Sequence, residues 1–147
     1  MDKKTLKQYR ALLREQELNN KAIDRLYDRL DNVPVVAGKV VGSSRNFPYT
    51  EVRTTVQMDE PVESDEINRR LKIREDRQEK IRAAVLEIEE FIAGIPDSEI
   101  RQVFEMVYID GMKMSEVADA VHLDKSRISR KISDFIKTQQ TQQNSML

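Results

Sequence analysis

Two long segments of the chain have the apolar spacing that is typical of α-helices. In residues 6–30, steps of three and four connect Leu6, Tyr9, Leu13, Gln16, Asn20, Ile23, Tyr27 and Leu30. In residues 64–93, the same steps connect Ile67, Leu71, Arg74, Gln78, Ile81, Val85, Ile88 and Ile92. Both series are apolar at the ends and polar in the middle. We therefore expect two helices that pair along these faces, either as an antiparallel hairpin or as a dimeric coiled coil. In the hairpin, Leu30 would meet Ile67 and Asn20 would lie near Gln78.

Residues 33–62, between the two predicted helices, have a different pattern. They contain most of the helix-breaking residues of the chain, namely Pro34, Gly38, Gly42, Pro48 and Pro61. Apolar and polar residues alternate from Val52 to Met58, as in a half-buried strand. We expect a small β excursion here, formed as a hairpin or as a flexible arm. Phe47 and Tyr49 are weak candidates for a partner-binding anchor, and the alternative is that they pack on the helices.

The C-terminal segment predicts three shorter helices joined by tight turns. The first spans 96–108 and follows the joint Gly94-Ile95-Pro96, and the second spans 114–121. The third spans 125–137. The apolar positions of these helices are Ile100, Val103, Phe104 and Val107, then Val117, Ala118 and Val121, then Ile128, Ile132, Phe135 and Ile136.

The turn before the last helix has specific signals. Asp124 is a typical N-cap residue, and Leu123 and Ile128 have the spacing of a hydrophobic staple. His122 occupies the turn position, where positive φ is expected. Together these features predict a helix-turn-helix over the last two helices.

The expected fold is therefore mainly α. Residues 1–93 form a long helical hairpin or coiled-coil arm with the β-like insertion 33–62, and serve in oligomerisation or partner binding. Residues 95–137 form a three-helix helix-turn-helix domain. Residues 138–147, which are rich in Gln and Thr, are expected to be a disordered tail.

The distribution of charge favours DNA binding. The chain has 25 Lys and Arg against 26 Asp and Glu, so it is almost neutral. From Leu123 to Leu147, however, five basic residues face only two acidic ones. On the last helix, the face opposite Ile128 is basic and polar, as on a recognition helix in the major groove. The expected DNA-binding residues are Lys125, Ser126, Arg127, Ser129, Arg130, Lys131, Ser133 and Lys137. The alternative is an ordinary amphipathic helix with a solvated basic face.

Other functional classes lack sequence support. There is no cysteine and one histidine, so metal-ligand spacing is absent, and no phosphate loop or nucleophile motif occurs. We expect no enzymatic activity, no catalytic residue, no metal and no cofactor. No apolar run is long enough to span a bilayer, and we expect a soluble, cytoplasmic protein without a membrane partner.

Two runs of the C-terminal segment carry a resemblance to a known family. Residues 111–118, followed by 121–128, resemble the helix-turn-helix of region 4 of sigma-70-type factors. The run 124–132 more closely resembles the sigma-region-4-like regulators encoded by phages and prophages of Gram-positive bacteria, a group that includes late-gene activators. The clear match covers residues 95–137, and residues 42–50 are similar to a loop in such phage proteins. Lys113 and His122 depart from the usual cap and turn residues of the motif.

The resemblance implies a sequence-specific, DNA-binding transcriptional regulator of phage or mobile-element genes. Its expected partners are double-stranded DNA and a second copy in a homodimer, with RNA polymerase as a further candidate. Helices that resemble sigma regions 2 and 3 are not recognisable, which favours a regulator over an initiation factor. Two alternatives stay open: a small terminase-like DNA-packaging protein, and a coiled-coil interaction protein that does not bind DNA.

Overall fold

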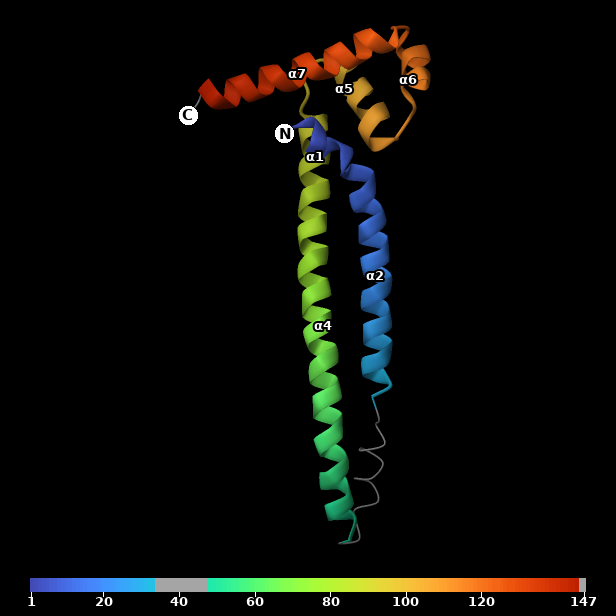
Figure 1. Cartoon of the computed structure of the whole chain (residues 1–147), viewed down its shortest axis with the longest axis vertical. Coiled ribbons are helices and arrows are strands. Elements are labelled where there is room, and N and C mark those ends of the chain that lie inside the picture. The colour runs from blue at the N-terminus through green and yellow to red at the C-terminus, as the bar shows by residue number, and fades with distance from the viewer. Residues whose placement is uncertain (34–47, 146–147) are drawn as a thin grey trace. The chain divides into compact units, whose positions relative to one another are not determined.

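The computed structural model describes the backbone of residues 1–33 and 48–145 and the side chains of residues 1–33 and 62–144 (Figure 1). Across this part of the chain the protein is mainly helical and has no strand. The helices are α1 (Lys3–Lys7), α2 (Tyr9–Asp31), α4 (Pro48–Ala93), α5 (Ser98–Phe104), the π-helix η1 (Glu105–Ile109), α6 (Met114–Val121) and α7 (Lys125–Ser145). The prediction of a mainly α fold is confirmed.

The predicted β excursion is not seen in the described residues. Residues 48–62 belong to α4, so the strand predicted at 52–58 is wrong, and α4 begins sixteen residues before the predicted start at Ser64. Pro48 stands in the first turn of α4, where its fixed φ suits a helix. Extending a helix that is already formed adds one backbone hydrogen bond for each residue, and a short alternation of apolar residues does not prevent this. Residues 34–47, including Phe47, lie outside the described residues, as does the side chain of Tyr49.

The chain forms two compact units. We call Met1–Gln16 with Ile81–Leu147 the terminal unit, and Glu17–Lys80 the central unit. Helices α2 and α4 each cross the boundary. The division expected near residue 94 does not coincide with these units, because the first sixteen residues and the end of α4 share a core with the C-terminal helices.

The central unit is an antiparallel pair formed by parts of α2 and α4. Leu26, Ile67 and Leu71 are its buried apolar residues, and Leu30 packs against them, as expected for the hairpin. Asn19 is buried and donates hydrogen bonds from Nδ2 to Gln78 Oε1 (2.9 Å) and to the Arg74 carbonyl oxygen (2.8 Å). A buried polar layer of this kind favours one register of the two helices.

The buried face of α2 differs from the predicted one by one residue in the middle. Asn19 and Leu26 are buried, whereas Leu13 and Tyr27 are 37% and 43% exposed. Tyr9, Gln16, Ile23 and Leu30 keep their predicted places, so only the order of the three- and four-residue steps between them differs. The predicted face of α4 is confirmed, except that Arg74 is only half-buried.

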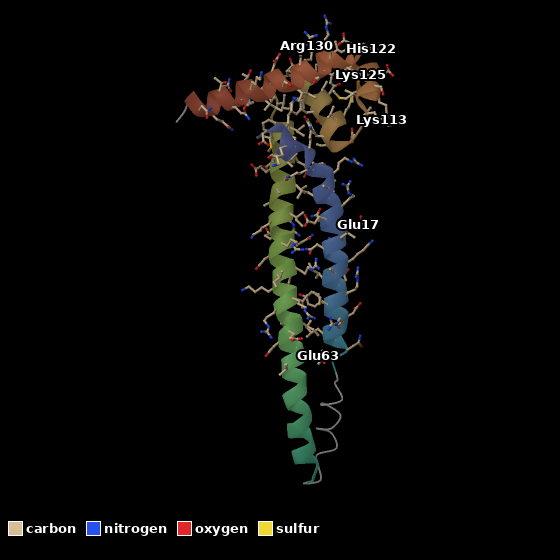
Figure 2. All side chains as sticks on the ribbon, viewed as in Figure 1. Glu17, Glu63, Lys113, His122, Lys125 and Arg130 are labelled. Carbon is tan, nitrogen blue, oxygen red and sulfur yellow. The ribbon has the colours of Figure 1, made fainter. Side chains whose placement is uncertain are left out.

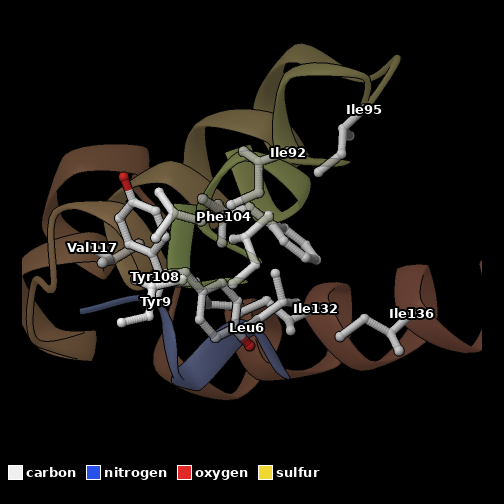
Figure 3. Close-up of a cluster of buried hydrophobic side chains, with 14 residues drawn as sticks. Leu6, Tyr9, Ile92, Ile95, Phe104, Tyr108, Val117, Ile132 and Ile136 are labelled. Carbon is white, nitrogen blue, oxygen red and sulfur yellow. The ribbon is translucent and has the colours of Figure 1, made fainter. Parts of the chain in front are cut away.

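The core of the terminal unit draws on both ends of the chain (Figure 3). Phe104 of α5 is fully buried at its centre. Its ring lies 5.5 Å from that of Phe135, 5.6 Å from Tyr108 and 6.3 Å from Phe91, measured between centroids. The residues buried around them are Leu6, Tyr9, Ile81, Val85, Ile88, Ile92, Ile95, Val103, Val117, Ile128, Ile132 and Ile136. This core fixes α6 and α7.

The helix predicted at 96–108 is α5 followed by a π-helical turn. The wider turn is closed by the Asp110 N–H, which donates to the Glu105 carbonyl oxygen (2.9 Å). Gly111 then adopts a φ of 67°, a conformation that favours glycine. Arg10 Nη1 donates to the Ile109 carbonyl oxygen (2.9 Å) and so satisfies one of the free carbonyls at this helix end.

Candidate nucleic-acid interface

A tight turn holds α6 against α7. His122 ends α6 with a φ of 58°, in the left-handed region, as the sequence predicts. The Leu123 N–H donates to the Ala118 carbonyl oxygen (3.1 Å), and the His122 N–H donates to the same oxygen. These bonds satisfy carbonyls at the end of α6 and reverse the chain within three residues. Lys113, at the start of α6, makes no side-chain cap hydrogen bond.

The start of α7 is fixed by Asp124. Its Oδ1 accepts hydrogen bonds from the Arg127 N–H (2.8 Å) and from the Ser126 hydroxyl (2.9 Å), so the predicted N-cap is confirmed. The hydrogen bond from the Arg127 backbone N–H lowers the pKa of the Asp124 carboxyl below its ordinary value, and the bond from the Ser126 hydroxyl lowers it further. The carboxylate is therefore ionised at neutral pH and caps the first turn of α7 through the Arg127 N–H.

Long basic side chains are exposed on the first turns of α7. Lys125, Arg127 and Arg130 are exposed, whereas Ile128 and Ile132 are buried in the core on the opposite side. Figure 2 shows Lys125 and Arg130 close to His122, at the end of α7 that follows the turn. Arg130 Nε lies 3.4 Å from the Ser126 carbonyl oxygen, a long contact that leaves the guanidinium free to bind elsewhere. Lys137 is exposed farther along the helix.

Three of the predicted site residues bond to other side chains of the protein. Lys131 Nζ lies 3.3 Å from Glu99 Oε1, in a salt bridge between α7 and α5. Ser133 is half-buried, and its hydroxyl accepts a hydrogen bond from Lys3 Nζ (2.6 Å). Ser126 donates its hydroxyl hydrogen to Asp124, and Ser129 is exposed at a neighbouring groove. The predicted residues thus separate into a free basic group, namely Lys125, Arg127, Arg130 and Lys137, the exposed Ser129, and three residues that bond within the fold, namely Ser126, Lys131 and Ser133.

The sequence-based prediction missed a second basic group, from the N-terminus. Lys3, Lys7 and Arg10 line a groove of about 370 Å³ in the terminal unit together with Ser129 of α7. Their spacing of four and three residues indicates one face of a helix, and this signal was available in the sequence. Their position beside α7 was not, since it depends on packing between residues more than 100 positions apart.

The described side chains offer no grouping that suits a metal ion. Over residues 1–33 and 62–144, no three His, Asp or Glu side chains are grouped so that they could hold a metal ion. Within the described helices, none is long and apolar enough to cross a membrane.

The chain matches a known protein family. Residues 51–140 match the model of a family described as Protein of unknown function (DUF1492), which is more than half of the 147 residues. The chain belongs to this family. The match includes α5, η1, α6 and α7 to Gln140, so the free basic group lies inside the matched segment, whereas Lys3, Lys7 and Arg10 lie outside it. No curated protein and no solved structure gives a match.

Proposed function

We propose that this chain is a sequence-specific DNA-binding regulator of the transcription of phage or mobile-element genes. In this proposal α6 and α7 form a helix-turn-helix, and α7 enters the major groove. The observation that carries it is the exposure of Lys125, Arg127 and Arg130 on the first turns of a helix whose other face is buried. Recognition helices contact bases mainly through residues near their N-termini.

The chemistry of these side chains suits the reading of bases. An arginine can donate two hydrogen bonds to O6 and N7 of guanine, which is the commonest specific contact in the major groove. Arg127 and Arg130 are three residues apart, so they lie on neighbouring positions of one face. Because Asp124 holds the first turn of α7, both side chains start from a fixed backbone.

Phosphate contacts would come from other lysines and arginines. Lys7 is exposed beside Ser129 and Lys137 is exposed on α7, whereas the neighbouring Lys3 and Arg10 already donate to Ser133 and to the Ile109 carbonyl oxygen. Contacts of this kind orient a protein on the duplex and carry no sequence information directly. They also make the affinity depend on salt, because each neutralised phosphate releases counterions.

The proposal includes a homodimer. Two copies would present two recognition helices to half-sites about one turn of DNA apart, ~34 Å. A dimer also raises the affinity for a two-part site without any new contact to a base.

Two single substitutions separate base reading from phosphate binding. We expect Arg130→Ala to cost roughly 1–3 kcal/mol on the correct site and to relax the preference at one base pair. We expect Lys137→Ala to weaken binding to all sequences alike and to lower the slope of log K against log salt by about one. Fluorescence anisotropy with specific and unrelated duplexes, over a series of salt concentrations, measures both effects.

The matched control is Lys80→Ala, which removes one exposed positive charge from α4 in the central unit. It should leave affinity and salt slope unchanged. If Arg130→Ala and Lys80→Ala had the same effect on specific and unrelated DNA, base reading by α7 would be excluded.

A further inference from the structure

The exposed surface of α4 in the central unit changes its sign of charge along the helix. From Val62 to Glu66 the ionisable residues are all acidic, and Glu63, Asp65 and Glu66 are exposed (Glu63 is labelled in Figure 2). From residue 69 to residue 77 there are five basic residues and only two acidic ones. These five are Arg69, Arg70, Lys72, Arg74 and Arg77. The helix thus has a negative and a positive half within a few turns.

The positive half borders a groove formed with α2. The groove has a volume of about 440 Å³ and is lined by Ala22, Arg25, Leu26, Arg29, Arg70, Ile73, Arg74 and Arg77. Five of these residues are arginines and none is acidic. Among the described side chains, no ion pair involves these five, although Arg74 donates a hydrogen bond to Asn19 (3.3 Å). The groove therefore presents five positive charges to which carboxylates of a partner could bind.

Within the central unit, two large apolar side chains of α4 are exposed. Val62 is 62% exposed and Ile73 is 59% exposed. They are eleven residues apart, which is close to three helical turns at about 3.6 residues per turn. They therefore share one face of α4, and Glu66, Arg70 and Arg77 fall on or next to it by the same count. This outer stripe is distinct from the seam that packs on α2, which contains Ile67 and Leu71.

We infer that the outer stripe of α4 is a self-association surface, and that it binds the same stripe of a second copy in an antiparallel arrangement. In an isologous contact, residue i of one copy meets residue j of the other, and j meets i. When Glu66 faces Arg70 of the other copy, the same register brings Val62 within one residue of Ile73, and each pair occurs twice. The acidic half of each helix then lies along the arginine groove of the other.

The mixed character of the stripe favours this occupant over DNA. Phosphate would satisfy the arginines but would leave Ile73 and Val62 in contact with water. A second α4 offers carboxylates and an aliphatic side chain at matching positions, so it covers both kinds of residue. The inference deepens the proposed homodimer by naming its interface. It can be tested without DNA, so its failure and that of the DNA-binding proposal are distinguishable.

Charge reversal on the full chain tests the interface. The mass in solution, measured by sedimentation, should be that of a dimer at low salt. Glu66→Arg and Arg70→Glu should each weaken the dimer at least about tenfold, since two attractive pairs become repulsive. An equimolar mixture of the two variants should again form a dimer, because both cross-pairs are then of opposite charge. Lys72→Glu is the matched control, because it reverses the charge of an exposed residue outside the stripe. It should leave the dimer affinity unchanged.

Cross-linking tests the register. The natural chain has no cysteine, so Val62→Cys mixed with Ile73→Cys should give a disulfide-linked heterodimer under mild oxidation. Leu86→Cys, which is also exposed, should not cross-link with Ile73→Cys. A monomer at every attainable concentration would overturn the inference. So would a dimer that neither reversal weakens, or one that the mixture of variants does not restore.

Discussion

Replacement of both Arg127 and Arg130 by alanine is expected to remove sequence-specific DNA binding. Each arginine is proposed to contact a base, and a good bidentate contact contributes roughly 1–3 kcal/mol of discrimination. Loss of both should weaken binding to the specific site by roughly 100-fold or more, while weak binding to unrelated DNA decreases much less. Anisotropy titrations at one fixed salt concentration measure the two affinities side by side.

The structure provides a control for this double variant. Lys21→Ala/Lys80→Ala also removes two positive charges, but from exposed positions in the central unit. This control should retain specific affinity. Both variants should keep the circular dichroism spectrum and melting temperature of the natural chain, because none of the four side chains is buried. Full specific affinity in the Arg127→Ala/Arg130→Ala variant would contradict the assignment of α7 as the reading helix.

The largest expected effect on stability comes from Phe104. Its side chain is fully buried and contacts rings from three other segments, namely Phe91, Tyr108 and Phe135. Phe104→Ala removes these contacts and leaves a cavity that helices in a tight core fill only in part. We expect the free energy of unfolding to decrease by roughly 3–5 kcal/mol. Urea denaturation followed by circular dichroism measures the change.

Leu86→Ala is the matched control for the core. Leu86 lies on α4 in the same unit but is 51% exposed, so its replacement should cost about 1 kcal/mol or less. A loss for Phe104→Ala no larger than that for Leu86→Ala would mean that the aromatic cluster does not hold the terminal unit together.

The features that the sequence predicted well depend on short-range chemistry. Helix α6 has its predicted bounds, Asp124 caps α7, and His122 takes positive φ. Each depends on residues within one or two turns, so the signals are present in a short stretch of sequence. The outward position of Arg127 and Arg130 follows in the same way from the helical period.

The features that it predicted poorly depend mainly on long-range packing. The choice between a step of three and a step of four is decided by contact with α4, so that Asn19, which bonds to Gln78, takes the place expected for Asn20. The bonds of Lys131 to Glu99 and of Ser133 to Lys3 join segments that no local pattern connects. Helix α7 continues to Ser145, beyond the predicted end at Lys137, since its Gln-rich end contains no residue that stops a helix. The alternation of apolar and polar residues at 52–58, from which a strand was expected, lies inside the long helix α4.

Selection of binding sites from random duplex DNA by the full chain tests whether α7 reads the sequence of bases. Repeated selection should enrich one short motif that contains guanine, and the Arg127→Ala/Arg130→Ala variant should enrich none. The Lys21→Ala/Lys80→Ala control should enrich the same motif as the natural chain. Failure of the natural chain to enrich any motif, or enrichment of an identical motif by the double arginine variant, would contradict the proposal that α7 reads DNA.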